Sequence, residues 1–72
     1  MKQERMGKVV FFDSYYGTIK EEKDCYLFSK YDMVTPIQVG DFVSFRKEEI
    51  GKQKVARFVK KRGFYHDQQK MG

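Results

Sequence analysis

The chain has 72 residues, of which 40% are hydrophobic and 35% charged, and its formal net charge is +5. A chain of this length forms at most one domain with one small core, and its composition is typical of a globular protein, not of a disordered tail. No apolar run approaches the roughly 20 residues that cross a bilayer, and the start MKQERMGK lacks the apolar centre of a signal peptide. We therefore expect a cytoplasmic protein with no membrane partner.

The positive charge is concentrated in one part of the chain. Residues 42–62 contain eight Lys or Arg residues against two Glu, for a net charge of +6, whereas residues 1–41 have a net charge of −1. Clustered cations repel one another unless an opposite charge offsets them, so this asymmetry favours a polyanionic partner. The alternative is a solvated basic face that serves solubility alone.

The sequence offers little for catalysis or metal binding. The single histidine, His66, lies after the last patterned segment, the two pairs of adjacent Glu lie in predicted turns, and the glycines are isolated. These features do not predict a histidine-based triad, a metal cluster or a phosphate-cradling loop. We expect neither an enzyme nor a cofactor, and no small-molecule substrate.

Five segments have the composition of β-strands, and turn residues separate them. In chain order they are residues 7–14, 15–20, 25–28, 42–47 and 54–61. Five short strands without helical periodicity predict a small closed barrel, because closure removes exposed sheet edges. We expect this barrel to span residues 6–62, between a flexible N-terminus at 1–5 and a flexible tail at 63–72.

The first segment contains four consecutive apolar residues, at positions 9–12, which break the alternation of a half-buried strand. We therefore expect at least one phenylalanine there to be exposed, as part of a contact surface. In the next two segments, alternation assigns inward positions to Ile19, Cys25 and Leu27. It assigns outward positions to Tyr16, Tyr26 and Phe28, which would form an aromatic platform with Phe11.

The second half of the barrel follows a long loop at residues 30–40, which contains the only proline and has room for one helical turn. We expect Ile37 and Val39 from this loop to close the barrel end. In the last two strands the predicted inward residues are Val43, Phe45, Ala56 and Phe58, with Arg57 outward.

Five segments spread over about residues 7–61 resemble bacterial cold-shock proteins. They are GKVVFFDS at 7–14, similar to G-x-V-K-W-F-N; YGTI at 16–19, similar to the end of the first RNA-binding motif, F-G-F-I; DCYLFS at 24–29, similar to the second, D-V-F-V-H-F; GDFVSF at 40–45, similar to G-Q-x-V-S-F; and VARF at 55–58, similar to A-A-N-V. The resemblance implies an all-β, five-stranded antiparallel OB-fold barrel of the cold-shock domain type that binds single-stranded RNA or DNA with little sequence preference.

The resemblance also implies roles for individual residues. Phe11 takes the position of the family's tryptophan, Tyr16 and Tyr26 those of two stacking phenylalanines, and Phe28 that of a histidine. All four exchanges keep a π-face for any base. The further candidate contacts are one aromatic residue, which is equally well placed for the core, and six cations that could meet phosphates: Phe12, Lys8, Lys20, Lys30, Lys52, Lys54 and Arg57.

Three positions depart from the family pattern. Thr18 and Ser29 stand where further stacking aromatics are expected, and Val10 stands where a lysine contacts phosphate. The candidates to compensate for these losses are Phe12, Tyr15, Tyr31 and Phe42. Two functions follow: binding of single-stranded nucleic acid, RNA more than DNA, with an RNA-chaperone role, or a protein-interaction module with weak or lost nucleic-acid binding. We expect a monomer, with a dimer as the alternative because apolar side chains are exposed.

Overall fold

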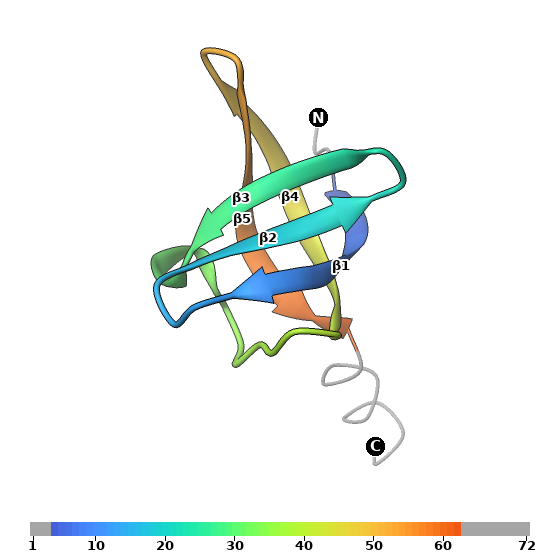
Figure 1. Cartoon of the computed structure of the whole chain (residues 1–72), viewed down its shortest axis with the longest axis vertical. Helices are drawn as coiled ribbons and strands as arrows, with labels where there is room; N and C mark the ends of the chain where they lie inside the picture. Colours follow the sequence, from blue (N-terminus) through green and yellow to red (C-terminus); the bar gives the residue numbers. More distant parts are fainter. Residues whose placement is uncertain (1–3, 63–72) are drawn as a thin grey trace.

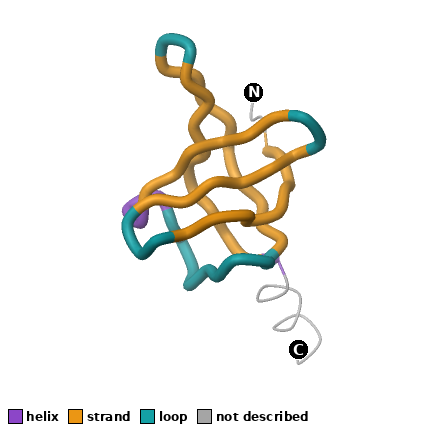
Figure 2. Tube along the Cα trace, in the orientation of Figure 1, coloured by secondary structure: helices purple, strands orange, loops and turns teal. Residues whose placement is uncertain are grey.

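The computed structural model describes residues 4–62 of the chain, and these residues form five strands and one short 3-10 helix (Figures 1 and 2). The elements are β1 (Glu4–Phe12), β2 (Tyr16–Glu21), β3 (Asp24–Ser29), η1 (Lys30–Asp32), β4 (Phe42–Ile50) and β5 (Gln53–Lys61). The strands close a barrel in the order β1-β2-β3-β5-β4, with β1 also paired to β4. The predicted all-β, five-stranded closed barrel is confirmed, and the sheet is mixed because β3 and β5 run parallel.

A β-bulge in β1 resolves the run of four apolar residues. Val9 pairs with Ile19 of β2, and Phe11 pairs with Thr18, so Val10 is an extra residue on β1. Val9 is buried, whereas the side chains of Val10 and Phe11 are both exposed. The expectation that this run exposes a phenylalanine is confirmed.

The register of the β2–β3 hairpin corrects the predicted faces of β3. Ile19 pairs with Tyr26 and Gly17 with Phe28, and directly opposed residues of antiparallel strands point to the same side of the sheet. Tyr26 and Phe28 are therefore in the barrel core, with 0% and 1% of their surface exposed. The prediction that they point outward is wrong, as is the prediction that Cys25 and Leu27 point inward, because both of these are exposed.

The core contains nine buried residues: Val9, Ile19, Tyr26, Phe28, Ile37, Val43, Phe45, Ala56 and Val59. The ring centroid of Tyr26 lies 4.9 Å from that of Phe45, with the planes tilted by 55°. The Tyr26 hydroxyl donates a hydrogen bond to Glu21 Oε1 at 3.2 Å, and Arg5 Nε donates to the same oxygen at 2.9 Å. The polar end of Tyr26 thus has a partner at the barrel rim, and burial raises the pKa of its hydroxyl.

A second bulge, in β5, changes the predicted inward set. Ser44 pairs with Lys60 and Arg46 with Arg57, so three steps on β5 oppose two on β4. Phe58, at the bulge, has a positive φ of 54° and is 60% exposed, and Val59 is buried in its place. The predicted inward positions of Val43, Phe45 and Ala56 are confirmed, and that of Phe58 is wrong.

The loop between η1 and β4 completes the barrel. Its Ile37 is buried, as predicted, whereas Val39 is 58% exposed. The helical turn predicted within residues 30–40 is confirmed by η1, which directly precedes this loop. The boundaries of the barrel differ slightly from those predicted, because β1 begins at Glu4, within the segment assigned to a flexible N-terminus.

The predicted flexible tail, residues 63–72, lies outside the described residues. In the part of the chain that is described, no helix has the length and apolar character needed to cross a membrane.

Candidate nucleic-acid interface

The outward side chains of β1, β2 and β3, together with Phe42 at the start of β4, form one continuous surface, which we call the outer face. The strand register arranges it in three cross-strand rows. The rows are Phe42, Lys8, Lys20 and Cys25; then Phe11, Thr18 and Leu27; then Tyr16 and Ser29. Because side chains in a row stand about 5 Å apart, each row is a set of neighbours.

Three aromatic rings on the outer face are open to solvent. Phe11 is 51% exposed, Tyr16 56% and Phe42 63%. Tyr15 and Tyr31 flank the row of Tyr16, and both rings lie near Lys30, whose Nζ is 4.9 Å from the Tyr15 centroid and 5.4 Å from the Tyr31 centroid. A ring that is half exposed can offer a π-face to a base, so the outer face has stacking surfaces at several points.

Asp13 fixes the loop that presents Tyr15 and Tyr16. Its Oδ1 accepts hydrogen bonds from the backbone N–H of Tyr15 at 3.0 Å and from that of Tyr16 at 2.9 Å. These two bonds, that from Tyr16 foremost, stabilise the carboxylate and lower the pKa of Asp13. The local sequence Asp-Ser-Tyr-Tyr therefore forms a hydrogen-bonded turn that sets the start of β2.

Ser29 has a structural role that accounts for the absence of an aromatic residue at this position. Its hydroxyl accepts a hydrogen bond from the backbone N–H of Tyr31 at 3.2 Å, and its own N–H donates to Asp32 Oδ2 at 3.0 Å. This is the capping box of η1. Arg57 Nη1 donates to Asp32 Oδ1 at 3.2 Å and links the cap to β5.

Two of the predicted aromatic contacts lie in the core, and a third is partly buried against it. Tyr26 and Phe28 are fully buried, and Phe12 packs against the core with its ring 5.9 Å from that of Phe28 at an angle of 16°. The predicted role of Tyr26 and Phe28 as stacking platforms is therefore wrong, because a buried ring has no free face for a base. The predicted contact of Phe12 with nucleic acid stays a prediction. The outward positions of β3 belong to Cys25, Leu27 and Ser29, so this strand contributes no stacking ring.

The six predicted cations fall into two groups. Lys8, Lys20 and Lys30 lie beside the exposed rings and, among residues 4–62, take part in no ion pair. The other three, Lys52, Lys54 and Arg57, lie on the β4–β5 ribbon.

Within that second group, two cations are already paired. Lys54 Nζ lies 3.0 Å from Asp24 Oδ1, and Arg57 Nε lies 2.7 Å from Glu48 Oε1. Lys52 is in the turn of the β4–β5 hairpin, which projects beyond the rest of the barrel in Figure 1. The structure thus brings four predicted residues together on the outer face, Phe11, Tyr16, Lys8 and Lys20, and places Lys30 of η1 beside it. Their contact with nucleic acid stays a prediction.

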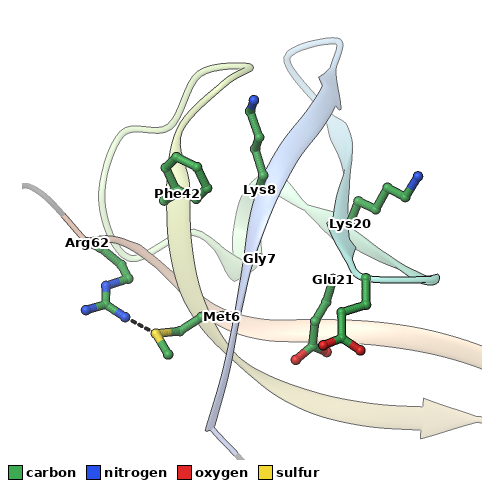
Figure 3. A pocket seen from close by; sticks show the side chains of 8 residues that line it. Met6, Gly7, Lys8, Lys20, Glu21, Phe42 and Arg62 are labelled. Atoms are coloured by element: carbon green, nitrogen blue, oxygen red, sulfur yellow. Dashed lines mark hydrogen bonds between the residues drawn. The ribbon is translucent and has the colours of Figure 1, made fainter.

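A hollow of about 440 Å³ adjoins the outer face where β4, β1 and β2 meet (Figure 3). Its lining includes Lys8, Lys20, Phe42 and Arg62. Lys8 Nζ is 5.7 Å from the centroid of the Phe42 ring, within cation–π range. Among residues 4–62, no group of three or more acidic, histidine or cysteine side chains is arranged to hold a metal ion.

A closed five-stranded barrel with this strand order is an OB-type barrel of the cold-shock kind. The solved structure described as drosophila Unr CSD456 has the same fold, with a TM-score of 0.73 over 85% of this chain and 15% sequence identity. The match covers 27% of that longer chain. At this identity the likeness establishes the fold alone. No protein-family model and no curated protein matches the sequence.

Proposed function

We propose that this protein is a divergent cold-shock-like protein that binds single-stranded nucleic acid on its outer face. The observation that carries the proposal is the pair of half-exposed rings on adjacent strands, Phe11 and Tyr16, beside three lysines that have no carboxylate partner among residues 4–62: Lys8, Lys20 and Lys30. Stacked bases and neutralised phosphates are the two contributions that OB-fold surfaces make to binding a single strand. The fold shared with a cold-shock domain structure supports the proposal.

The middle of the outer face limits the expected affinity. Thr18 and Leu27 complete the row of Phe11, and neither offers a ring. Because each stacked base contributes roughly 1–3 kcal/mol, we expect a short footprint and weak binding with little sequence preference. We propose RNA as the preferred strand, and a chaperone role in which binding to the unpaired form shifts weak RNA structure toward melting.

Isothermal titration calorimetry at two salt concentrations tests the proposal. The ligands are oligo(U), oligo(dT) and a duplex of equal length. We expect the single strands to bind and the duplex not to bind. Three lysine–phosphate contacts predict a slope of log affinity against log salt of about −2, since each contact contributes about −0.7 for a single strand. A Tyr16→Ala variant is expected to bind about 5- to 150-fold more weakly. Absence of single-strand binding at low salt would contradict the proposal.

A second candidate function is a protein-interaction module that retains the barrel. The observation in its favour is the apolar strip of Val10, Phe11 and Leu27 in the middle of the outer face, where Val10 and Leu27 are 45% and 39% exposed. Such a strip suits a protein surface as well as a base. This candidate is supported if the titration finds no nucleic-acid binding while the protein remains folded by circular dichroism.

A further inference from the structure

We infer that Phe42, Lys8 and Lys20 form an additional nucleotide subsite at the β4 edge of the outer face. One nucleotide of the bound strand stacks its base on Phe42, and the two phosphates that flank it lie beside the two lysines. The inference rests on the proposed function and extends it to a strand, β4, for which no contact was predicted apart from Phe42 as a compensating aromatic. We call this arrangement the Phe42 subsite.

The strand register places the three side chains together. Lys8 of β1 pairs with Phe42 of β4 on one side and with Lys20 of β2 on the other. The three residues therefore stand in one row and point to the same side of the sheet. The ring of Phe42 is 63% exposed, the largest exposed fraction among the outer-face aromatics Phe11, Tyr16 and Phe42.

The charges around the hollow favour an anion on the Lys8 side. Three cations line it, Lys8, Lys20 and Arg62, against the carboxylates of Glu21 and Glu22. In Figure 3 the Lys8 ammonium and the Glu21 carboxylate point in opposite directions.

Glu21 and Arg62, two of the other charged residues that line the hollow, are each held by a contact. Glu21 accepts a hydrogen bond from Arg5 at 2.9 Å, which offsets its charge. The Arg62 guanidinium contacts the Met6 sulfur, which is a weak acceptor and carries no charge. Among residues 4–62, no carboxylate pairs with Arg62. A phosphate near Lys8 and Lys20 therefore meets positive potential, while an aromatic ring beside it remains open to a base.

The subsite continues the path set by the other exposed rings. Along β2, Tyr16 and Lys20 are four residues apart, which corresponds to about 13 Å between the first and last rows. Phe11 lies in the row between them. A strand that stacks on Tyr16 and Phe11 thus reaches Phe42 if it extends along the direction of β1. The subsite compensates for the rings that Thr18 and Ser29 do not provide.

Oligo(dT) of about four to ten nucleotides, titrated by calorimetry into the wild type and two matched variants, tests the inference. The variants are Phe42→Ala and Phe58→Ala, which remove the same side chain at positions 63% and 60% exposed. Phe58 lies off the outer face, with its ring under Arg46 of β4. Circular dichroism first confirms that both variants are folded.

We expect Phe42→Ala to bind the longest oligonucleotide about 5- to 150-fold more weakly than the wild type does. Its affinity should reach a maximum at an oligonucleotide one nucleotide shorter than for the wild type. We expect Phe58→Ala to bind as the wild type does. A Lys8→Gln/Lys20→Gln double variant is expected to reduce the salt slope by about 1.4.

The inference is overturned if Phe42→Ala retains wild-type affinity and length dependence, or if Phe58→Ala weakens binding equally. If Tyr16→Ala weakens binding in that same experiment, the proposed function stands without the subsite; if the wild type does not bind, the proposed function itself fails.

Discussion

Tyr26 shows that the direction of an aromatic ring matters more than its presence in a motif. Its ring is fully buried against Phe45, and its hydroxyl bonds to Glu21 at the rim. Truncation of such a residue to alanine costs about 3–5 kcal/mol, which is comparable to the whole stability of a domain of this size. A loss of binding in Tyr26→Ala would therefore report unfolding, and Tyr16 and Phe11 are the positions that test stacking.

Gly17 is the position on β2 where the core leaves no room for a side chain. A Cβ added there would meet the ring of Phe28 and would lie 2.8 Å from the backbone oxygen of Phe11. We expect Gly17→Ala to destabilise the protein by about 1–3 kcal/mol, because the Phe28 ring and the β1 backbone have to shift. Urea denaturation of the variant measures this change in the free energy of unfolding.

A double-mutant cycle separates the clash from other effects of this substitution. In a Phe28→Leu background the added methyl group meets a smaller side chain, so the cost of Gly17→Ala should fall. Additive effects of the two substitutions would show that contact with the Phe28 ring is not the cause.

The β2–β3 hairpin shows how much of the fold, and how little of the site, could be predicted from the sequence. Strand composition and turn residues located all five strands, and they required no knowledge of register. The faces of β3 depended on pairing across the Glu22-Lys23 turn, in which Lys20 opposes Cys25 and Ile19 opposes Tyr26. Counting outward from a symmetric turn pairs Tyr26 with Ile19, which was predicted to point inward. The sequence therefore contained the information that places Tyr26 inward.

The two bulges are the part that local alternation could not predict. A bulge adds one residue to one strand and reverses the faces of all the residues that follow it. The bulge of β1 exposes Phe11 after Val9 has pointed inward, and the bulge of β5 exposes Phe58 and buries Val59. The position of each bulge depends on the partner strand, which is distant in sequence.

Phe58 adopts a backbone conformation that glycine tolerates better than any residue with a Cβ. Its φ is +54°, and the left-handed region costs roughly 1–2 kcal/mol for an ordinary residue. We expect Phe58→Gly to be about 1 kcal/mol more stable than Phe58→Ala, since both lose the ring and only glycine relieves the backbone. Thermal unfolding of the two variants, compared with each other, measures the difference. Equal melting temperatures would show that the bulge relaxes when the ring is absent.

Across the whole molecule, ion pairs account for part of the charge asymmetry that the sequence displays. Three cations of the basic segment pair with carboxylates that precede it: Lys54 with Asp24 at 3.0 Å, Arg57 with Asp32 at 3.2 Å and Lys61 with Asp41 at 3.8 Å. Two of these pairs join β5 to β3 or η1, where the backbone pairing among residues 4–62 consists of the bridges Leu27–Val55 and Met33–Val59. Charge that appeared to indicate a polyanion thus also helps to close the barrel.

The Lys54–Asp24 pair and the hydrogen-bonded turn at Asp13 make the stability of the barrel depend on pH. Lys54, through its hydrogen bond, lowers the pKa of Asp24 below the ordinary value of 3.8, and the turn amides lower that of Asp13. Because both shifts favour the carboxylate in the folded state, their contribution is complete above about pH 3.8 and is lost as the pH falls through the lowered pKa values. We expect the melting temperature to fall below that pH.

Thermal unfolding between about pH 7 and pH 2 measures this dependence. Asp24→Asn should show a shallower fall than the wild type, because it lacks one of the two titrating groups. A melting temperature that stays constant down to pH 2, or an unchanged profile in Asp24→Asn, would contradict the assignment of the acid sensitivity to these carboxylates.

The exposed thiol of Cys25 has a practical consequence. Cys25 pairs with Lys20 and therefore stands at the β3 end of the row that contains Lys8 and Phe42. The chain contains one cysteine, so a maleimide dye would attach at a single position. The unmodified sequence thus provides an attachment point for a fluorescent reporter beside the Phe42 subsite, and occupancy of the outer face can be followed without introducing a cysteine.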